Sequence, residues 1–258
     1  MSDPQQTKEE PVEETFISHL VELRNRIMRA VAAVIVVFVG LVYWAPDIFR
    51  LLARPLMQNL PRDGKMIVTD VTGSFFVPMK VTMLVAFVIA LPIMLYQIWA
   101  FVAPGLYQHE KKLVGPLVFS SYSLFLCGMA FAYFIVFPTI FRVTAYYNAP
   151  LGAEMTIDID NYLSFVLTMF LAFGVTFEVP IVVVLLARMG MVTIPKLKQI
   201  RPYVIVGAFI ISAVVTPPDV FSQLILAIPL IILYEAGIIA ARLVVPKQGV
   251  KSEELTVK

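Results

Sequence analysis

The stretch that decides the fold is FLAFGVTFEVPIVVVLLA, Phe170–Ala187, in which Glu178 is the single charged residue. Such a run is typical of a transmembrane helix, because about 20 predominantly apolar residues cross the hydrocarbon core of a bilayer. A backbone in lipid must satisfy its own hydrogen bonds, and the run does not alternate between polar and apolar residues as a barrel strand would. We therefore predict a membrane helix over residues 163–187.

The rest of the chain repeats this pattern. Of its 258 residues, 59% are hydrophobic and only 15% are charged, which is typical of a membrane protein. The fifth apolar run is short, since roughly 14 residues give about 21 Å of helix. It predicts a thinner bilayer, a helix covered by other helices, or a short hairpin with the sixth run. We expect an all-α integral membrane protein with six transmembrane helices, the other five spanning 27–44, 76–98, 113–137, 202–215 and 221–240.

The distribution of charge predicts the topology. Placing both termini inside puts 14 of the 20 lysines and arginines on the inner side, which favours an N-in, C-in arrangement. The N-terminal segment resembles neither a signal peptide nor an organelle transit peptide, which favours a bacterial origin. We expect a disordered acidic cytoplasmic tail over 1–18, one transmembrane domain over 19–242 and a second cytoplasmic tail over 243–258. Prolines and apolar residues in the first outer loop predict short amphipathic helices.

Several function classes find no support in the sequence. A net charge of +2 does not suggest a nucleic-acid surface, and Cys127 has no second cysteine with which to form an intrachain disulfide. His19 and His109, the two histidines, lie at separate polar borders, so we expect no metal centre. The chain has neither a Gly-rich phosphate loop nor a hydrolytic set of Ser, His and Asp, so we expect no cofactor and no enzymatic activity.

A carboxylate stands among basic residues at the first membrane border, in SHLVELRNRI, Ser18–Ile27. Helical spacing places His19, Glu22 and Arg26 on one face. One interpretation is that Glu22 and Arg26 form an intrahelical ion pair four residues apart. The other is that Glu22 joins Glu110 in a cytoplasmic acidic pocket for a cationic ligand. Glu110, in FVAPGLYQHEKKL, could instead compensate the dipole at the start of the third span.

Two further polar positions lie in or beside the membrane. Burying Glu178 as an ion costs at least about 2.5 kcal/mol, so it should be protonated, hydrogen-bonded, or facing water or a partner. The adjacent Pro180 should bend that helix. In TPPDVFSQ, Thr216–Gln223, either Asp219 caps the sixth helix or this turn has a functional role, and Gln223 would face a partner helix or a hole in the bundle.

These stretches together resemble the TatC family. The resemblance rests on HLVELRNRI, FVAPGLYQHEKK, GMAFAYFIVFP, YLSFVLTMFLAFGVTFEVP, RPYVIVGAFIISAVVTPPDVFSQ and AIPLIILYEAG, and it covers about His19 to Arg242. It implies a concave bundle of six helices in the bacterial inner membrane. It further implies that this bundle is the receptor of the twin-arginine protein translocase, which exports folded proteins using the proton-motive force.

The resemblance also implies roles for particular residues. Glu22 and Glu110 match the carboxylates that recognise the arginine pair of a signal peptide, a geometry that suits a guanidinium and that lysine cannot reproduce. Arg24, Phe101 and His109 match neighbouring positions of that signal-peptide site, and Pro55 matches the first outer loop. Glu178 matches the polar residue within the membrane. The docking site for single-span TatA and TatB type subunits corresponds to Thr216, Asp219 and Gln223.

The resemblance also implies that copies of the receptor associate with one another. Two other function classes remain as alternatives to a receptor. A small-solute or proton-coupled carrier could use Glu178 as its protonation site. An intramembrane enzyme has less support, because the sequence offers no paired catalytic set. Solute transport by purified vesicles without partner subunits would identify a carrier.

Overall fold

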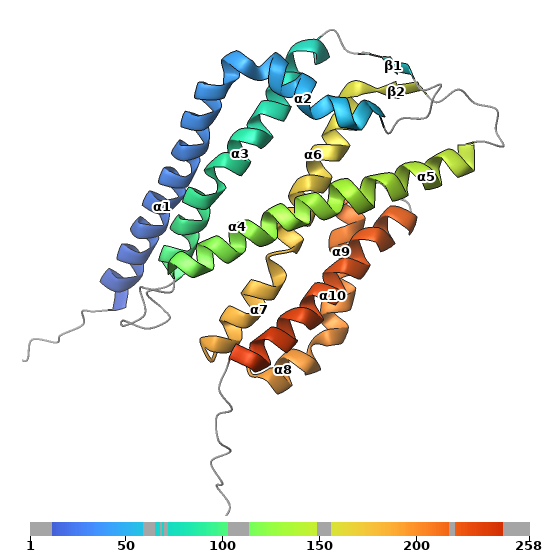
Figure 1. Cartoon of the computed structure of the whole chain (residues 1–258). Coiled ribbons are helices and arrows are strands. Elements are labelled where there is room, and N and C mark those ends of the chain that lie inside the picture. Colours follow the sequence, from blue (N-terminus) through green and yellow to red (C-terminus); the bar gives the residue numbers. More distant parts are fainter. Residues whose placement is uncertain are drawn as a thin grey trace, which may run out of the picture. The chain divides into compact units, whose positions relative to one another are not determined.

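The computed structural model describes residues 12–58, 65–67, 69, 72–102, 114–148, 156–216 and 220–244 (Figure 1). The chain divides into two compact units. The first comprises residues 1–55 and 70–122, and the second comprises residues 56–69 and 123–258. Each unit is described by itself.

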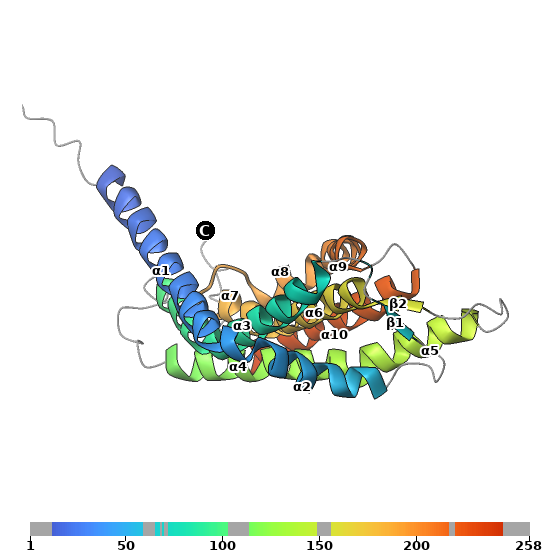
Figure 2. The ribbon, with the colours of Figure 1, turned by 90° about the horizontal axis from the view of Figure 1, so that it is seen from above.

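The first unit is built on two long helices that pack side by side (Figures 1 and 2). These are α1, Val12–Leu41, and α3, Gly73–Val102. A 3₁₀ turn over Val42–Trp44 connects α1 to α2, Ala45–Gln58. Helix α1 buries Ala30 but leaves large apolar side chains such as Val36 and Val39 exposed, as expected of a helix that faces lipid.

A buried hydrogen bond joins α3 to the start of α4, Val114–Phe131. The indole nitrogen of Trp99 donates to Ser121 Oγ at 3.0 Å, and both residues are buried. The neighbouring Ser120 instead donates within its own helix, to the carbonyl of Pro116 at 2.8 Å. Ser121 therefore bonds between helices and Ser120 within one helix, so substituting each in turn compares the two kinds of hydrogen bond.

Replacing Ser121 by alanine should lower the free energy of unfolding by about 1 kcal/mol, because the buried indole N–H would lose its acceptor. Thermal unfolding of the purified protein in detergent measures the change. Ser120→Ala is the matched control and should stay within about 0.5 kcal/mol of the native chain. Equal effects of the two substitutions would contradict the assigned role of Ser121.

The second unit contains the remaining helices. The last part of α4 continues through a π-helical segment, Ala132–Val136, into α5, Phe137–Asn148. Helices α6, Ile159–Thr176, and α7, Val179–Arg188, are followed by the short α8, Ile194–Gln199. Helices α9, Arg201–Val215, and α10, Val220–Val244, complete the unit, and α10 packs against both α7 and α9.

Helices α4 and α6 approach each other closely at two glycines. A Cβ on Gly128 would overlap the carbonyl oxygen of Phe173 and lie 3.1 Å from the Cα of Gly174. A Cβ on Gly174 would in turn overlap the ring of Phe125, which is buried. Small residues let membrane helices pack backbone to backbone, and these two glycines have that role here.

A small sheet, absent from the sequence prediction, joins two loops of the second unit. Strands β1, Lys65–Ile67, and β2, Thr156–Asp158, pair in parallel, with Met66 opposite Ile157. Asp158 continues the connection, because its carboxylate accepts from Thr69 Oγ1 at 2.8 Å and from Asn161 Nδ2 at 2.9 Å. It also caps α6 by accepting from the amide of Asp160 at 3.2 Å.

The fourth predicted span is confirmed, including the bend expected beside Pro180. Helix α6 ends at Thr176, two turn residues follow, and α7 begins at Val179. Proline has no amide hydrogen for the carbonyl of Thr176, but it suits the first turn of a new helix. Gly237 lets α10 pack closely against the start of α7, because a Cβ added at this position would lie only 3.0 Å from the Cα of Pro180.

The remaining predictions on the fold have mixed outcomes. Among the described residues, five helical segments are long and apolar enough to cross a membrane, and α9 is the short sixth, so the six predicted spans are confirmed. Helix α2 confirms a helix in the first outer loop. Helix α1 begins at Val12, and no proline or glycine lies between Pro11 and Gly40. The division into an N-terminal tail over 1–18, a membrane domain and a C-terminal tail stays a prediction. The N-in, C-in topology and the concave arrangement stay predictions.

Candidate functional site

The first candidate site lies on α1, where Glu22 meets Arg26. Both Nε and Nη2 of Arg26 donate to the same carboxylate oxygen, Glu22 Oε1, at 2.9 and 2.6 Å. The predicted intrahelical ion pair is therefore confirmed. No described residue donates a hydrogen bond to Oε2, and the Glu22 side chain remains 40% exposed. Arg26 thus fixes the carboxylate while one oxygen stays open to a ligand.

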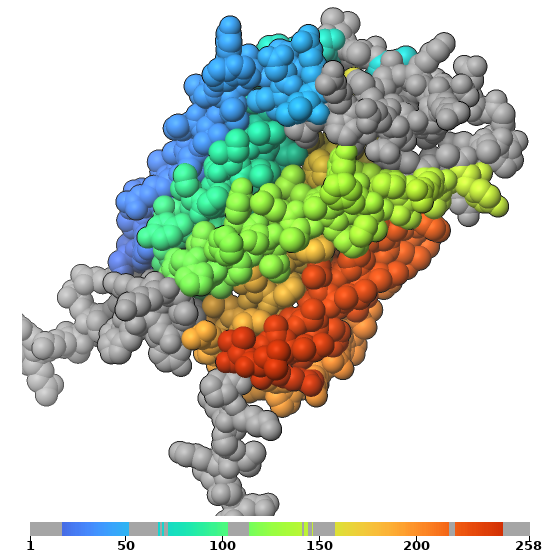
Figure 3. Space-filling model, viewed as in Figure 1, coloured from blue at the N-terminus to red at the C-terminus, as the bar shows by residue number. Residues whose placement is uncertain are grey.

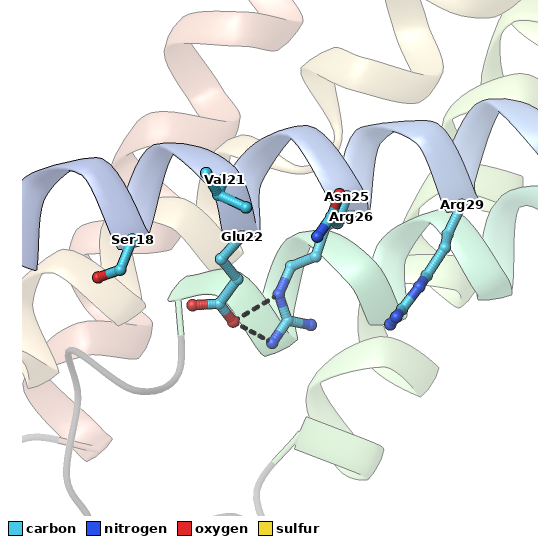
Figure 4. Close-up of a pocket in the computed structure, with 6 residues that line it drawn as sticks. All are labelled: Ser18, Val21, Glu22, Asn25, Arg26 and Arg29. Carbon is cyan, nitrogen blue, oxygen red and sulfur yellow. Dashed lines mark hydrogen bonds and ion pairs between the residues drawn. The ribbon is translucent and has the colours of Figure 1, made fainter.

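A surface pocket of about 270 Å³ surrounds this ion pair (Figure 4). Its lining residues recur at intervals of three and four, so they share one face of α1. Among the described residues that line it, Glu22 is the only carboxylate, and Figure 4 shows its side chain beside that of Arg26. The lining residues are Ser18, Val21, Glu22, Asn25, Arg26 and Arg29.

An aromatic stack stands one helical turn before Glu22. The rings of His19 and Phe101 lie 4.4 Å apart between centroids, with an interplanar angle of 19°. Phe101 belongs to the last turn of α3, so the stack joins the start of the α1 membrane border to the end of α3. The structure therefore brings the predicted residue Phe101 into the same unit and the same neighbourhood as Glu22.

The other predicted members of this site have different positions. Arg24 is exposed and donates weakly to the side-chain oxygen of Asn25 at 3.4 Å, on a different face from the ion pair. His109 and Glu110 lie outside the described residues, so their proposed pairing with Glu22 stays a prediction. Pro55 lies in α2, and its role in the first outer loop stays a prediction.

Glu178 occupies the interruption between α6 and α7. It is the residue immediately before α7, and both of its carboxylate oxygens are buried from solvent. The structure thus places the predicted membrane-embedded carboxylate where the helix breaks, within a segment otherwise apolar enough to cross a membrane.

Two of the predicted docking residues lie where α9 ends and α10 begins: Thr216 follows α9, and Gln223 lies in the first turn of α10. Thr216 is buried and donates to the carbonyl of Ser212 at 2.8 Å. Gln223 Nε2 donates to the carbonyl of Phe209 at 3.0 Å, which joins α10 to α9. Gln223 therefore holds α9 and α10 together as a hairpin, whereas Thr216 bonds within the end of α9. Asp219 lies outside the described residues.

Sequence reasoning missed one ion pair between helices. Arg201 Nη2 lies 2.5 Å from Glu235 Oε2, which joins the start of α9 to α10. The two residues are 34 positions apart, so helical spacing could not pair them. The available signal was a lone carboxylate in the sixth apolar run, which requires a cationic partner or water.

The described residues contain no group of three or more His, Cys, Asp or Glu side chains that could hold a metal ion. The candidate site is instead built from ion pairs and aromatic contacts on apolar helices. Such an arrangement can bind a charged segment beside a membrane, and the pocket on α1 is the feature best suited to a guanidinium.

Comparison with known proteins identifies the family. A family model for the Sec-independent protein translocase protein TatC matches residues 18–229. The protein of that name from Haemophilus influenzae is 52% identical over 232 residues, covering 90% of each chain. The one from Escherichia coli K12 is 51% identical over 238 residues, covering 92% of each chain.

Solved structures agree with these sequence matches. A crystal structure of the twin-arginine translocase receptor TatC has a TM-score of 0.76 and 39% sequence identity, covering 87% of this chain and 98% of that one. A second, in the detergent DDM, has a TM-score of 0.79 and 38% identity, covering 86% and 99%. The several apolar helices make this a multi-pass membrane protein. The chain therefore belongs to the TatC family of Sec-independent protein translocase proteins.

Proposed function

We propose that the chain is the receptor that binds twin-arginine signal peptides of folded cargo in the bacterial inner membrane. As a TatC-family protein it is a translocase component and not an enzyme. The observation that carries the proposal is the Glu22 carboxylate, in which Oε1 is held by Arg26 and Oε2 has no described donor. This geometry suits an incoming guanidinium, which presents planar paired donors.

In the proposed site, Glu22 contacts one arginine of the signal peptide. The His19–Phe101 stack lies next to it and offers a flat apolar surface on which a guanidinium or the apolar part of the peptide can rest. Glu110 supplies the second carboxylate, and His109 flanks the site. Arg24 contributes from the neighbouring face of α1. The hydrogen bonds from Arg26 hold the Glu22 carboxylate in one orientation. An intrahelical pair of this kind stabilises the helix by only about 0.3–0.5 kcal/mol.

The other predicted site residues have separate proposed roles. Glu178 supplies a polar group within the membrane, and Pro55 belongs to the outer loop. Thr216, Asp219 and Gln223 form the docking turn for single-span TatA and TatB type subunits, which supply the protein-wide passage that a bundle of six helices cannot enclose. The proton-motive force drives transport, and copies of the chain associate with one another. The domain covers 19–242, with cytoplasmic tails at either end.

A binding measurement tests the receptor proposal. We expect a fluorescent signal peptide carrying two arginines to bind the purified protein in nanodiscs at least tenfold more tightly than the same peptide carrying two lysines. Glu22→Ala combined with Glu110→Ala should remove most of that difference, because the preference depends on paired carboxylate contacts. Equal affinity for the two peptides would refute recognition of the guanidinium geometry.

The family assignment favours this receptor over the small-solute carrier considered from the sequence. A carrier should move a solute into vesicles that contain the chain alone. We expect no such uptake, whereas binding of the signal peptide should persist in the same vesicles.

A further inference from the structure

The charged side chains of α7 to α10 are strongly biased in sign. Within residues 179–216 and 220–244 there are six charged residues, and five of them are basic. The one carboxylate, Glu235, is already paired with Arg201. We call the five basic residues the basic corner: Arg188, Lys196, Lys198, Arg201 and Arg242.

Packing holds the helix ends that carry these residues close to one another. Tyr234 of α10 donates to the carbonyl of Leu197 in α8 at 2.8 Å, and both side chains are buried in one apolar cluster. Arg201 at the start of α9 is bound to Glu235 of α10. Figure 1 shows α8 beside the last turns of α7 and of α10. In Figure 3, α10 (red) and the orange residues of α8 and α9 form one continuous surface.

The basic corner is available to a ligand. Lys196, Lys198 and Arg242 are exposed. The Arg201 side chain is 41% exposed although it is paired with Glu235.

Large apolar side chains are exposed around these cations. Tyr203 near the start of α9 is 78% exposed, Met191 in the turn before α8 is 65% exposed, and Leu243 in the last turn of α10 is 84% exposed. Tyrosine at a helix end is typical of the boundary between headgroups and acyl chains. The positive-inside rule accounts for basic residues on one side of the membrane, but not for their gathering among exposed apolar groups at one packed end.

We propose that the basic corner binds the headgroup of an anionic phospholipid. Lys196 and Lys198 donate to the phosphodiester oxygens, Arg201 contributes the donors that Glu235 leaves free, and Met191 and Tyr203 lie against the acyl chains. Basic pockets between helices on the cytoplasmic side bind such headgroups. A soluble anion or an acidic peptide would leave the apolar groups in water, so the lipid suits this surface better. The inference rests on the membrane location of the chain and not on its binding of signal peptides.

Thermal unfolding of the purified full-length protein tests this site. We expect phosphatidylglycerol, added to the neutral detergent, to raise the unfolding midpoint by about 5 °C, because a ligand that binds the folded state stabilises it. Phosphatidylcholine should leave the midpoint unchanged. Lys196→Gln combined with Lys198→Gln should lose at least half of the shift with phosphatidylglycerol, yet keep the native midpoint in phosphatidylcholine.

The matched control removes the same charge elsewhere on the protein. Arg50→Gln combined with Arg142→Gln neutralises two exposed arginines of α2 and α5, and the full shift should remain. An equal shift with phosphatidylcholine, or an undiminished one in the lysine variant, would overturn the site. Equal stabilisation by inorganic phosphate or by polyglutamate would overturn the lipid in favour of a free anion or an acidic protein segment.

Discussion

Glu22→Gln should reduce export of a folded reporter with a twin-arginine signal peptide at least tenfold, while the variant still accumulates in the membrane. The substitution preserves the shape of the side chain but removes the charge that the guanidinium requires. Hydrogen bonds to charged groups contribute about 1.5–3 kcal/mol, and 1.4 kcal/mol corresponds to a factor of ten in binding. Pulse-labelling of cells in which the variant is the only copy measures the export rate.

Asp47→Asn is the matched control for that experiment. Asp47 is an exposed carboxylate in an intrahelical pair, 3.6 Å from Arg50 in α2, so the substitution removes the same charge from a similar pair. Export should stay near the native rate. Arg26→Gln should have a smaller effect than Glu22→Gln, because it keeps the carboxylate and removes only the group that orients it. Native export by Glu22→Gln would show that the open oxygen is not the binding atom.

Gly128→Ala should be strongly damaging, lowering the free energy of unfolding by at least about 2 kcal/mol. The added Cβ would overlap the carbonyl oxygen of Phe173, and a backbone oxygen inside a packed helix cannot move aside as a flexible side chain can. Loss of the folded peak in size-exclusion chromatography after heating in detergent measures the effect.

Gly115→Ala in the same helix is the control. A Cβ at Gly115 has no neighbour within 4 Å, so the change should be neutral or stabilising by up to about 1 kcal/mol, as expected from helix propensity. Similar melting curves for the two variants would mean that α4 and α6 do not cross at Gly128.

Hydropathy predicted the membrane helices because each span needs about 20 mostly apolar residues to cross the lipid. Its backbone polar groups must then hydrogen-bond to one another, which makes the span a helix. Thus α3 contains the predicted 76–98, and α10 contains 221–240. The break beside Glu178 also followed from sequence, because Pro180 removes a local hydrogen bond. These features depend on neighbouring residues along the chain.

What the sequence did not reveal depends on contacts between distant residues. Strands β1 and β2 are three residues each and pair across about 90 positions, so no alternating pattern could develop. The Arg201–Glu235 pair and the His19–Phe101 stack likewise require helices to meet first. At the candidate site, spacing predicted the partner of Glu22, but only the structure shows that Arg26 donates to one carboxylate oxygen and leaves the other open.

The most direct test of the receptor account is a crosslinking cycle in membranes. A photoreactive group beside the arginine pair of a signal peptide is used to measure crosslinks to the native chain and to Glu22→Gln, with either two arginines or two lysines in the peptide. We predict strong crosslinks for the native chain with arginines and weak ones for the other three combinations, because removing either partner removes the same contact. Two results would contradict the proposal that Glu22 holds the arginine pair. One is a loss of crosslinks for the double change that equals the product of the two single losses. The other is strong crosslinks between Glu22→Gln and the arginine peptide.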